Sequence, residues 1–198
     1  MKEHYHSTKG AIQEAYHVYI KHGLKEVIKD EVAVLEIGFG TGLNCFITFL
    51  ETDKKINYVG VEAYPVTNEE VASMNYVSEL KATAHKAIFD KMHSVSWNEE
   101  HQIKEGFQLT KRKQFFKDIT DENKFDVIYF DAFGPDKQPD LWTSIIFDVM
   151  YKALKKDGVL VTYSAKGDVR RTLIAVGFEV EKLQGPPGKR HMLRGIKK

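Results

Sequence analysis

Residues Val34–Asn44 read VLEIGFGTGLN, and this stretch decides the fold of the 198-residue chain. A short apolar run is followed by three glycines at alternate positions, Gly38, Gly40 and Gly42, and then by an apolar-rich segment that extends to about Glu51. Glycine tolerates a positive φ and lets a ligand approach the backbone where a Cβ would collide. The stretch therefore predicts a strand, a glycine turn and a helix, the first unit of a nucleotide-binding α/β sheet.

The glycine spacing is GxGxG, not the GxGxxG of dinucleotide-binding folds, and Glu36 lies two residues before the first glycine. This version resembles motif I of S-adenosylmethionine-dependent methyltransferases. Their ligand carries a sulfonium and an ammonium instead of a pyrophosphate, so an acid belongs in the loop. The resemblance implies that the cofactor is bound by Glu36, Gly38, Gly40, Thr41, Gly42 and Asn44.

A second acid supports a nucleoside ligand. Glu62 ends the next expected strand, Asn57–Val61, and lies 22 residues after Gly40. A carboxylate in that position can accept hydrogen bonds from both hydroxyls of a ribose. We therefore expect Glu62 to bind the cofactor as well.

Composition is that of a soluble globular protein, with 42% hydrophobic and 29% charged residues. We expect one domain, residues 32–198, with a helical extension over residues 1–31. The N-terminus contains no apolar segment and no run of membrane-spanning length, so we expect a cytoplasmic protein. The single cysteine, Cys45, excludes an internal disulfide, and no ligand cluster for a metal is apparent.

The order of elements predicts the fold class. Strands alternate with helices up to about residue 177, and two strands then follow in close succession. That order implies an α/β fold, a mostly parallel sheet with helices on both faces and a final antiparallel strand, which is the layout of the Rossmann-like class I methyltransferases. The expected strands are Val32–Ile37, Asn57–Val61, Phe107–Thr110, Asp126–Asp131, Gly158–Ser164, Phe178–Lys182 and Met192–Ile196. The expected helices are Ala11–His22 (capped by Ser7 or Thr8), Leu43–Glu51, much of 67–93, Leu141–Leu154 and Val169–Ala175, while His93–Gln102 reads equally as a lid or a loop.

Asp131 is the expected catalytic residue. It ends the buried strand DVIYFD, which should lie beside the first strand, so its carboxylate would face the glycine turn. For transfer of a methyl group to an amine, such a carboxylate would accept hydrogen bonds from the amine, aim its lone pair and stabilise the cationic product. We expect Asp131 to position the amine, to serve as a candidate proton acceptor and, beside the glycine turn, to contribute to cofactor binding.

Basic residues are concentrated near the C-terminus, where residues 151–198 contain 12 Lys and Arg against 4 Asp and Glu. Either a polyanion partner or an ordinary solvated surface explains this excess. If their loops converge, Lys137, Lys166, Arg170, Arg171, Lys189 and Arg190 would form a cradle for phosphates. Phe133, Trp142 and Tyr163 offer surfaces on which a flipped base could stack, although such aromatics more often belong to the core.

Taken together, the chain resembles the methyltransferase domain of the MnmC family, bifunctional enzymes that modify the wobble uridine of tRNA. The matching stretches are EAYHVYIKHGL, EIGFGTGLN, VEAYP, DVIYFDAFGPDKQPDLW, TYSAKGDVRR and GPPGKRHMLRG. The resemblance implies S-adenosylmethionine-dependent methylation of 5-aminomethyl-2-thiouridine in tRNA to the 5-methylaminomethyl form. Two features depart from the family. First, no oxidase domain follows in this sequence, so we expect another enzyme to supply the aminomethyl nucleotide. Second, the basic residues Lys111–Lys113 follow the third expected strand, where an acid often holds the adenine. Asp90, Glu99 or backbone groups are the candidates for that contact.

Two other functions are consistent with the same residues. A small-molecule amine methyltransferase or aminopropyltransferase would share the acids and need no basic cradle. A binding module would keep the cofactor fold without catalysis, and the presence of Asp131 argues against it.

Overall fold

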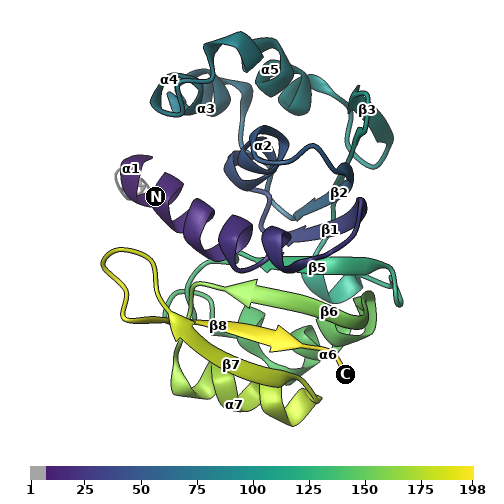
Figure 1. The fold of residues 1–198 in the computed structure, drawn as a ribbon, viewed down its shortest axis with the longest axis vertical. Helices are drawn as coiled ribbons and strands as arrows, with labels where there is room; N and C mark the ends of the chain where they lie inside the picture. Colours follow the sequence, from purple (N-terminus) through teal and green to yellow (C-terminus); the bar gives the residue numbers. More distant parts are fainter. Residues whose placement is uncertain (1–7) are drawn as a thin grey trace.

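The computed structural model describes residues 8–198, which form an eight-stranded sheet in the order β3-β4-β2-β1-β5-β6-β8-β7 (Figure 1). The neighbouring strands from β4 to β6 pair in parallel, whereas β3 and β8 run antiparallel to their neighbours. The strands are β1 Glu31–Ile37, β2 Lys55–Glu62, β3 Glu100–Lys104, β4 Phe107–Lys113, β5 Phe125–Phe130, β6 Leu154–Thr162, β7 Glu179–Gln184 and β8 His191–Ile196. The expected α/β sheet with a final antiparallel strand is confirmed.

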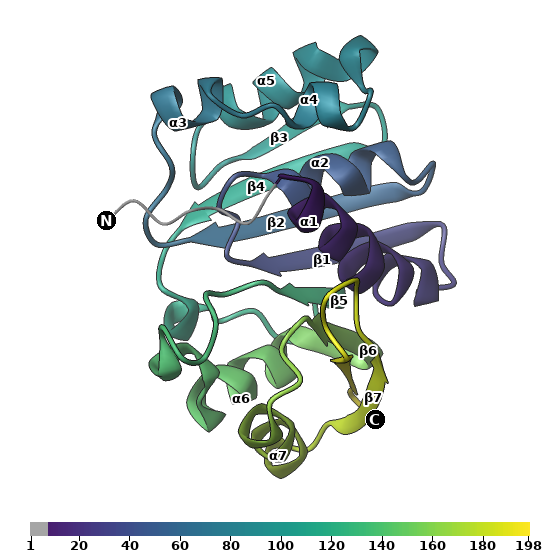
Figure 2. The ribbon, with the colours of Figure 1, turned by 90° about the vertical axis from the view of Figure 1, so that its left-hand side faces the viewer.

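Helices cover both faces of the sheet and enclose two apolar cores (Figure 2). One core lies under the N-terminal helical segment, α2 and α5, and the other lies under α6 and α7. The α-helices are α1 Thr8–Glu14, α2 Leu43–Leu50, α3 Asn68–Ala72, α4 Tyr76–Glu79, α5 Lys86–Ser94, α6 Ser144–Ala153 and α7 Gly167–Val176. Gly177 ends α7 with a φ of 118°, the left-handed conformation typical of a glycine after a helix.

The N-terminal segment is part of the main core. After α1, residues Ala15–Lys21 form a π-helix and Leu24–Glu26 a short 3-10 turn. The side chains of Val18, Tyr19 and Ile20 are at most 1% exposed. Of the two expected caps, Ser7 lies outside the described residues and Thr8 is the first residue of α1.

The region expected to be either a lid or a loop, 93–102, contains a short loop over residues 95–99 between the end of α5 and the start of β3. Residue Ser94 ends α5, Trp97 forms an isolated bridge with Lys111, and Glu100 begins β3, which pairs with β4. Strand β3 is at the edge of the sheet and buries only Ile103, so its sequence lacks the alternation that identifies a half-buried strand. Likewise α6 begins at Ser144 and not at Leu141, because residues Pro139–Trp142 form a 3-10 turn.

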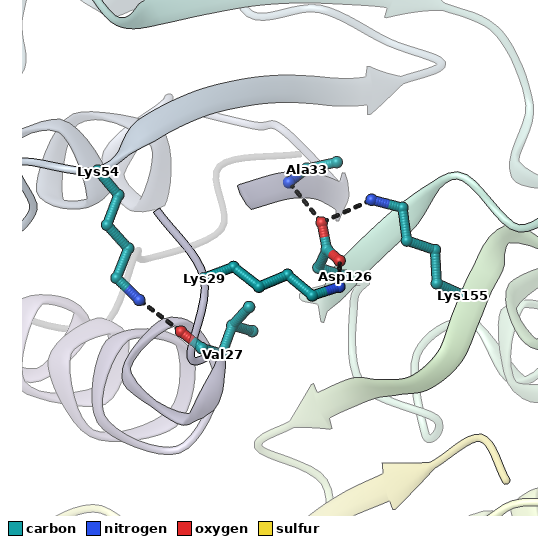
Figure 3. Close-up of polar contacts among 6 residues, drawn as sticks. All are labelled: Val27, Lys29, Ala33, Lys54, Asp126 and Lys155. Atoms are coloured by element: carbon teal, nitrogen blue, oxygen red, sulfur yellow. Dashed lines mark hydrogen bonds and ion pairs between the residues drawn. The ribbon is translucent and has the colours of Figure 1, made fainter. Parts of the chain in front are cut away.

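A polar clamp ties the amino ends of the central strands together (Figure 3). Asp126, near the start of β5, is 2% exposed and accepts hydrogen bonds from Lys29 at 2.6 Å, from the Ala33 N–H at 2.9 Å and from Lys155 at 2.9 Å. These donors come from the segment before β1, from β1 and from β6. The clamp therefore joins these three segments to β5, at the end of the sheet opposite the glycine turn.

Candidate active site

The glycine turn follows β1 and crosses the carboxyl ends of the neighbouring strands. Gly38, Gly40 and Gly42 all have positive φ values, 87°, 47° and 70°. A Cβ on Gly38 would lie 2.8 Å from the carbonyl oxygen of Asp131, and the N–H groups of Gly38 and Phe39 both bond to the Val61 carbonyl at 3.0 Å. Because the turn is packed this closely against β2 and β5, only glycine fits at Gly38.

Glu62 and the glycine turn come together as the sequence predicted. Oε2 of Glu62 accepts a hydrogen bond from the Gly40 N–H at 3.1 Å, and Oε1 accepts one from the Tyr64 N–H at 3.0 Å. Each carboxylate oxygen keeps a second lone pair for another donor. The turn is also fixed by Thr41, whose hydroxyl lies 3.0 Å from the hydroxyl of Tyr76 in α4.

A hydrogen-bonded chain links two carboxylates beneath the turn. Asn44 Nδ2 donates to Glu36 Oε1 at 2.9 Å and to Asp131 Oδ2 at 2.8 Å. Tyr58 donates to the other oxygen of Glu36 at 2.8 Å, and Tyr19 donates to the other oxygen of Asp131 at 2.7 Å. The chain therefore connects five elements: the N-terminal π-helix, the end of β5, α2 and the paired strands β1 and β2.

The two carboxylates differ in exposure. Glu36 is 1% exposed, and burial raises its pKa well above its ordinary value despite the bonds from Asn44 and Tyr58. Asp131 is partly exposed, and burial raises its pKa to about 7, while the hydrogen bonds from Tyr19 and Asn44 act in the opposite direction. Asp131 is therefore the carboxylate of this pair that titrates near neutral pH and can also reach a ligand, whereas Glu36 orients Asn44.

Sequence reasoning missed Tyr19. It lies in the π-helix Ala15–Lys21, a rare helical form that occurs often at functional sites. In the sequence it is one apolar position of an amphipathic helix, with no signal that its hydroxyl meets a carboxylate 112 residues away. Only the docking of this helix against the carboxyl end of β5 reveals the contact.

An aromatic and charged cluster borders Asp131. The Tyr163 hydroxyl, just after β6, donates to the Ala132 carbonyl at 2.8 Å. The Lys189 ammonium lies 3.9 Å from the centroid of the Tyr163 ring and forms an ion pair with Glu14 in α1. The α1 and π-helical segment and the loop between β7 and β8 are thus neighbours here, and His17 Nε2 lies 2.8 Å from the Gln184 carbonyl (Figures 1 and 2).

Ion pairs within the chain involve part of the expected phosphate cradle. Lys166 forms an ion pair with Asp136, and Arg171 forms one with Asp168 in the same helix. The residues that follow β5 and β6 therefore converge, but part of their positive charge is neutralised. Lys137, Arg170 and Arg190 are exposed.

Two of the aromatic residues considered for base stacking, Phe133 and Trp142, differ in exposure. Phe133 is 54% exposed, whereas Trp142 is 6% exposed and donates from its indole nitrogen to the Phe133 carbonyl at 2.8 Å. Trp142 also packs against Phe130 and Phe147. Trp142 is a core residue, and Phe133 remains the candidate for stacking.

The basic residues Lys111–Lys113 were expected to follow the third strand, but they form the end of β4, and Lys111 is buried. Lys111 is 1% exposed, donates to the His93 carbonyl at 2.7 Å and lies 5.0 Å from the centroid of the Trp97 ring. Burial lowers the pKa of Lys111 to about 8. Of the two acids considered for the adenine contact, Asp90 pairs with Lys86 on α5 and Glu99 accepts a hydrogen bond from Ser96 at 2.5 Å.

The residues at this edge fit a nucleoside ligand with a cationic centre. The glycine turn leaves backbone accessible at Gly40, where no atom except the Gly38 carbonyl, at 3.8 Å, would meet a Cβ. Glu62 lies beside it for a ribose, and Asp131 supplies negative charge nearby. Within residues 8–198, no group of three His, Cys, Asp or Glu side chains is arranged to hold a metal, and no helix has the length and hydropathy needed to cross a membrane.

Comparison with known proteins gives a consistent result. Residues 79–198 match the model of a family described as S-adenosyl-L-methionine-dependent methyltransferase. The chain is 29% identical over 207 residues to the tRNA 5-methylaminomethyl-2-thiouridine biosynthesis bifunctional protein MnmC of Hydrogenovibrio crunogenus, and 30% identical over 213 residues to that of an Azoarcus species. These alignments cover 96% of this chain but 31% and 32% of the relatives, so the chain spans about a third of their length.

Two solved structures show the same fold. The MnmC2 protein of Aquifex aeolicus superposes with a TM-score of 0.70 at 22% identity, over 98% of this chain and 63% of that one. Spermidine synthase from Thermotoga maritima superposes with a TM-score of 0.58 at 17% identity, over 96% of this chain and 61% of that one.

Proposed function

Because this chain belongs to the S-adenosyl-L-methionine-dependent methyltransferase family, we propose that it methylates the aminomethyl group of 5-aminomethyl-2-thiouridine, or of 5-aminomethyluridine, at the wobble position of tRNA. The product is the 5-methylaminomethyl nucleotide. The observation that supports this proposal most strongly is the position of Asp131, held at the edge of the glycine turn by hydrogen bonds from Tyr19 and Asn44. The names of the MnmC relatives refer to the biosynthesis of 5-methylaminomethyl-2-thiouridine in tRNA, which is the product of this reaction.

The cofactor, S-adenosylmethionine, supplies an electrophilic methyl group when bound. Its adenosine and methionine portions would be held by the backbone from Gly38 to Gly42, including Thr41, and by Glu62 at the ribose. Asn44 would lie near the charged end of the cofactor, with Glu36 orienting the Asn44 amide from below.

Asp131 positions the acceptor amine. Its carboxylate accepts hydrogen bonds from the amine, which directs the nitrogen lone pair and stabilises the positive charge that develops on nitrogen. In well-aligned model reactions such orientation contributes roughly 7–11 kcal/mol to lowering the barrier. With a pKa of about 7, Asp131 also has the basicity to take up the proton that the amine must lose.

Contacts with RNA are assigned to the exposed residues around this edge. Phe133 would stack on the target base, and Lys137, Lys166, Arg170, Arg171, Lys189 and Arg190 would contact phosphates. In the MnmC proteins the matching segment is about a third of the chain. We propose that an oxidase or another enzyme activity, outside the fold described here, supplies the aminomethyl nucleotide. A tRNA-modifying role places the protein in the cytoplasm.

A small-molecule amine is the second candidate substrate. Three of the cradle residues, Lys166, Arg171 and Lys189, already pair with acids of the chain, which reduces the charge available to a polyanion. The fold shared with spermidine synthase is consistent with an aminopropyltransferase or amine methyltransferase as well.

Nucleoside mass spectrometry tests the substrate directly. We expect tRNA from cells lacking the gene to accumulate 5-aminomethyl nucleosides and purified protein with S-adenosylmethionine to convert them. Replacing Arg170 and Arg190 with Glu should raise KM for tRNA about tenfold. The control replaces Lys55 and Lys156, which are exposed at the opposite end of the sheet, with Glu and should leave KM unchanged. Unchanged nucleosides in the deletion strain, together with no conversion in vitro, would exclude the tRNA function.

A further inference from the structure

Lys189 places an ammonium group over the ring of Tyr163, in the cluster that borders the candidate catalytic carboxylate. Its Nζ atom lies 3.9 Å from the centroid of the Tyr163 ring and pairs with the Glu14 carboxylate. Tyr163 in turn bonds to the carbonyl of Ala132, the residue that follows Asp131. The positive charge of Lys189 is close enough to act on Asp131, whose pKa it lowers.

The loop that carries Lys189 has a defined conformation. The Lys189 N–H bonds to the Pro186 carbonyl at 2.9 Å, and the Gly185 N–H bonds to the Arg190 carbonyl at 3.2 Å. A Cβ on Gly185 would lie 2.4 Å from the Lys189 carbonyl oxygen, so glycine lets the loop close on itself. The loop is also joined to the N-terminal helix through His17, whose Nε2 lies 2.8 Å from the Gln184 carbonyl. The Lys189 side chain is 40% exposed, so its ammonium can leave the ring without disturbing a buried core.

The surroundings of this ammonium are those that proteins use to bind alkylammonium groups. Aromatic rings attract cations through their π faces, and nearby carboxylates favour the charged form of an amine. Here the ring is that of Tyr163 and the carboxylates are Glu14 and Asp131, and Tyr19 holds Asp131 in place. We call the four residues Glu14, Tyr19, Asp131 and Tyr163 the amine box.

We propose that Lys189 is an internal occupant of the amine box, which receives the aminomethyl group of the substrate, and that Lys189 leaves the box to pair with an RNA phosphate when the substrate binds. This inference rests on the proposed function, because that function supplies both the amine and the phosphates. The amine box accepts one ammonium at a time. The amine of a substrate with phosphates displaces the Lys189 ammonium, and a phosphate of the same substrate then pairs with that ammonium. A free amine without phosphates must displace Lys189 unaided.

The proposal predicts opposite effects on two probes. The first probe is 5-aminomethyluridine, which has the amine and no phosphate, and the second is an anticodon stem-loop carrying the same nucleotide. In Lys189→Met, which keeps most of the apolar stem, the nucleoside should bind about five- to tenfold more tightly, because the competing ammonium is gone. The stem-loop should bind about threefold more weakly at 50 mM salt, because the loss of one phosphate contact outweighs the removal of the competing ammonium. Dissociation constants are measured by calorimetry with S-adenosylhomocysteine present.

Matched variants separate this role from others. Lys182→Met removes an exposed lysine from the same hairpin and should leave nucleoside binding unchanged. Lys189→Gln serves as a second neutral variant if Lys189→Met has a lowered unfolding temperature. Unchanged or weaker nucleoside binding in both neutral variants would overturn the proposal, even where the wild-type protein methylates the stem-loop. Failure of the wild-type protein to bind or methylate either probe would instead count against the proposed function.

Discussion

The hydroxyl of Tyr19 lies 2.7 Å from Oδ1 of Asp131, and this bond joins the N-terminal π-helix to the carboxyl end of a central strand. Asn44 holds the other oxygen of the same carboxylate. Both donors favour the ionised form of Asp131, while burial favours the neutral form, and the balance sets its pKa at about 7. The contact thus controls the protonation of the candidate catalytic group as well as its direction.

Replacing Tyr19 with Phe should shift the pH dependence of methylation. Loss of one hydrogen bond to the carboxylate raises the pKa of Asp131 by about one unit, since such bonds contribute roughly 1.5 kcal/mol or more. The acidic limb of the profile of kcat/KM should therefore move to higher pH, with activity largely recovered near pH 9. Tyr16→Phe makes the same change in the same helix, where the neighbour is Glu51, and should leave the profile in place. An unshifted limb in Tyr19→Phe would show that the bond does not tune Asp131.

Asp131→Asn should lose at least about a hundredfold in turnover and keep its affinity for S-adenosylhomocysteine. The same substitution should change how stability depends on pH. The folded-state pKa of Asp131 is about 7 and its ordinary value 3.8, so the wild-type protein loses stability as pH rises through this window. The loss is at most roughly 4 kcal/mol, and Asn does not incur it. Urea unfolding at pH 4 and pH 8 should show the variant gaining stability relative to wild type at the higher pH only. Full turnover would remove Asp131 from the mechanism.

Gly60→Ala should weaken cofactor binding from beneath the glycine turn. A Cβ on Gly60 would lie 2.2 Å from Cδ2 of Phe39, which is 3% exposed and stands between two glycines of the turn. The ring must move, at a cost of about 1–3 kcal/mol, and the turn with it. We expect S-adenosylhomocysteine to bind roughly tenfold more weakly by calorimetry. Adding Phe39→Leu makes room and should restore much of the affinity, and a double variant as weak as the single one would contradict this cause.

Asp126→Ala should lower stability without changing catalysis. It removes the acceptor shared by Lys29, Lys155 and the Ala33 N–H at the edge opposite the active site. We expect a loss of about 1–3 kcal/mol in the free energy of unfolding, with kcat/KM unchanged. Burial alone would raise the pKa of Asp126, but the hydrogen bonds and ion pairs from these partners outweigh it and hold the pKa below its ordinary value. The contribution of Asp126 to stability is therefore complete above about pH 4 and is lost as the pH falls further. The difference between variant and wild type should shrink accordingly at low pH, as checked by urea unfolding. Asp148→Ala, which breaks an exposed pair with Lys152, should have little effect at any pH.

The sequence by itself determined the strand, glycine turn and helix, and the acids at the ends of their strands. These features are local: the apolar run of β1, the positive φ that only Gly38 and its partners tolerate, and the alternation of elements that makes a parallel sheet. Because the carboxyl ends of parallel strands meet at one edge of the sheet, the sequence also predicted that Glu62 and Asp131 lie near the turn. Glu62 accepts a hydrogen bond from Gly40 there. A polar edge strand such as β3 carries no comparable local signal.

Only the tertiary structure decided the partners of these residues. It joined Tyr19 to Asp131 and Lys189 to Glu14, pairs separated by most of the chain, and it paired Lys166 with Asp136. It also buried Glu36, which the sequence grouped with the residues expected to bind the cofactor. The physical reason is that hydrogen bonds and ion pairs depend on the packing of whole elements, which neither hydrophobic periodicity nor residue spacing specifies. The stretch Val34–Asn44 therefore identified the cofactor fold, whereas the surroundings of Asp131 were settled by the docking of the N-terminal helix and the C-terminal hairpin.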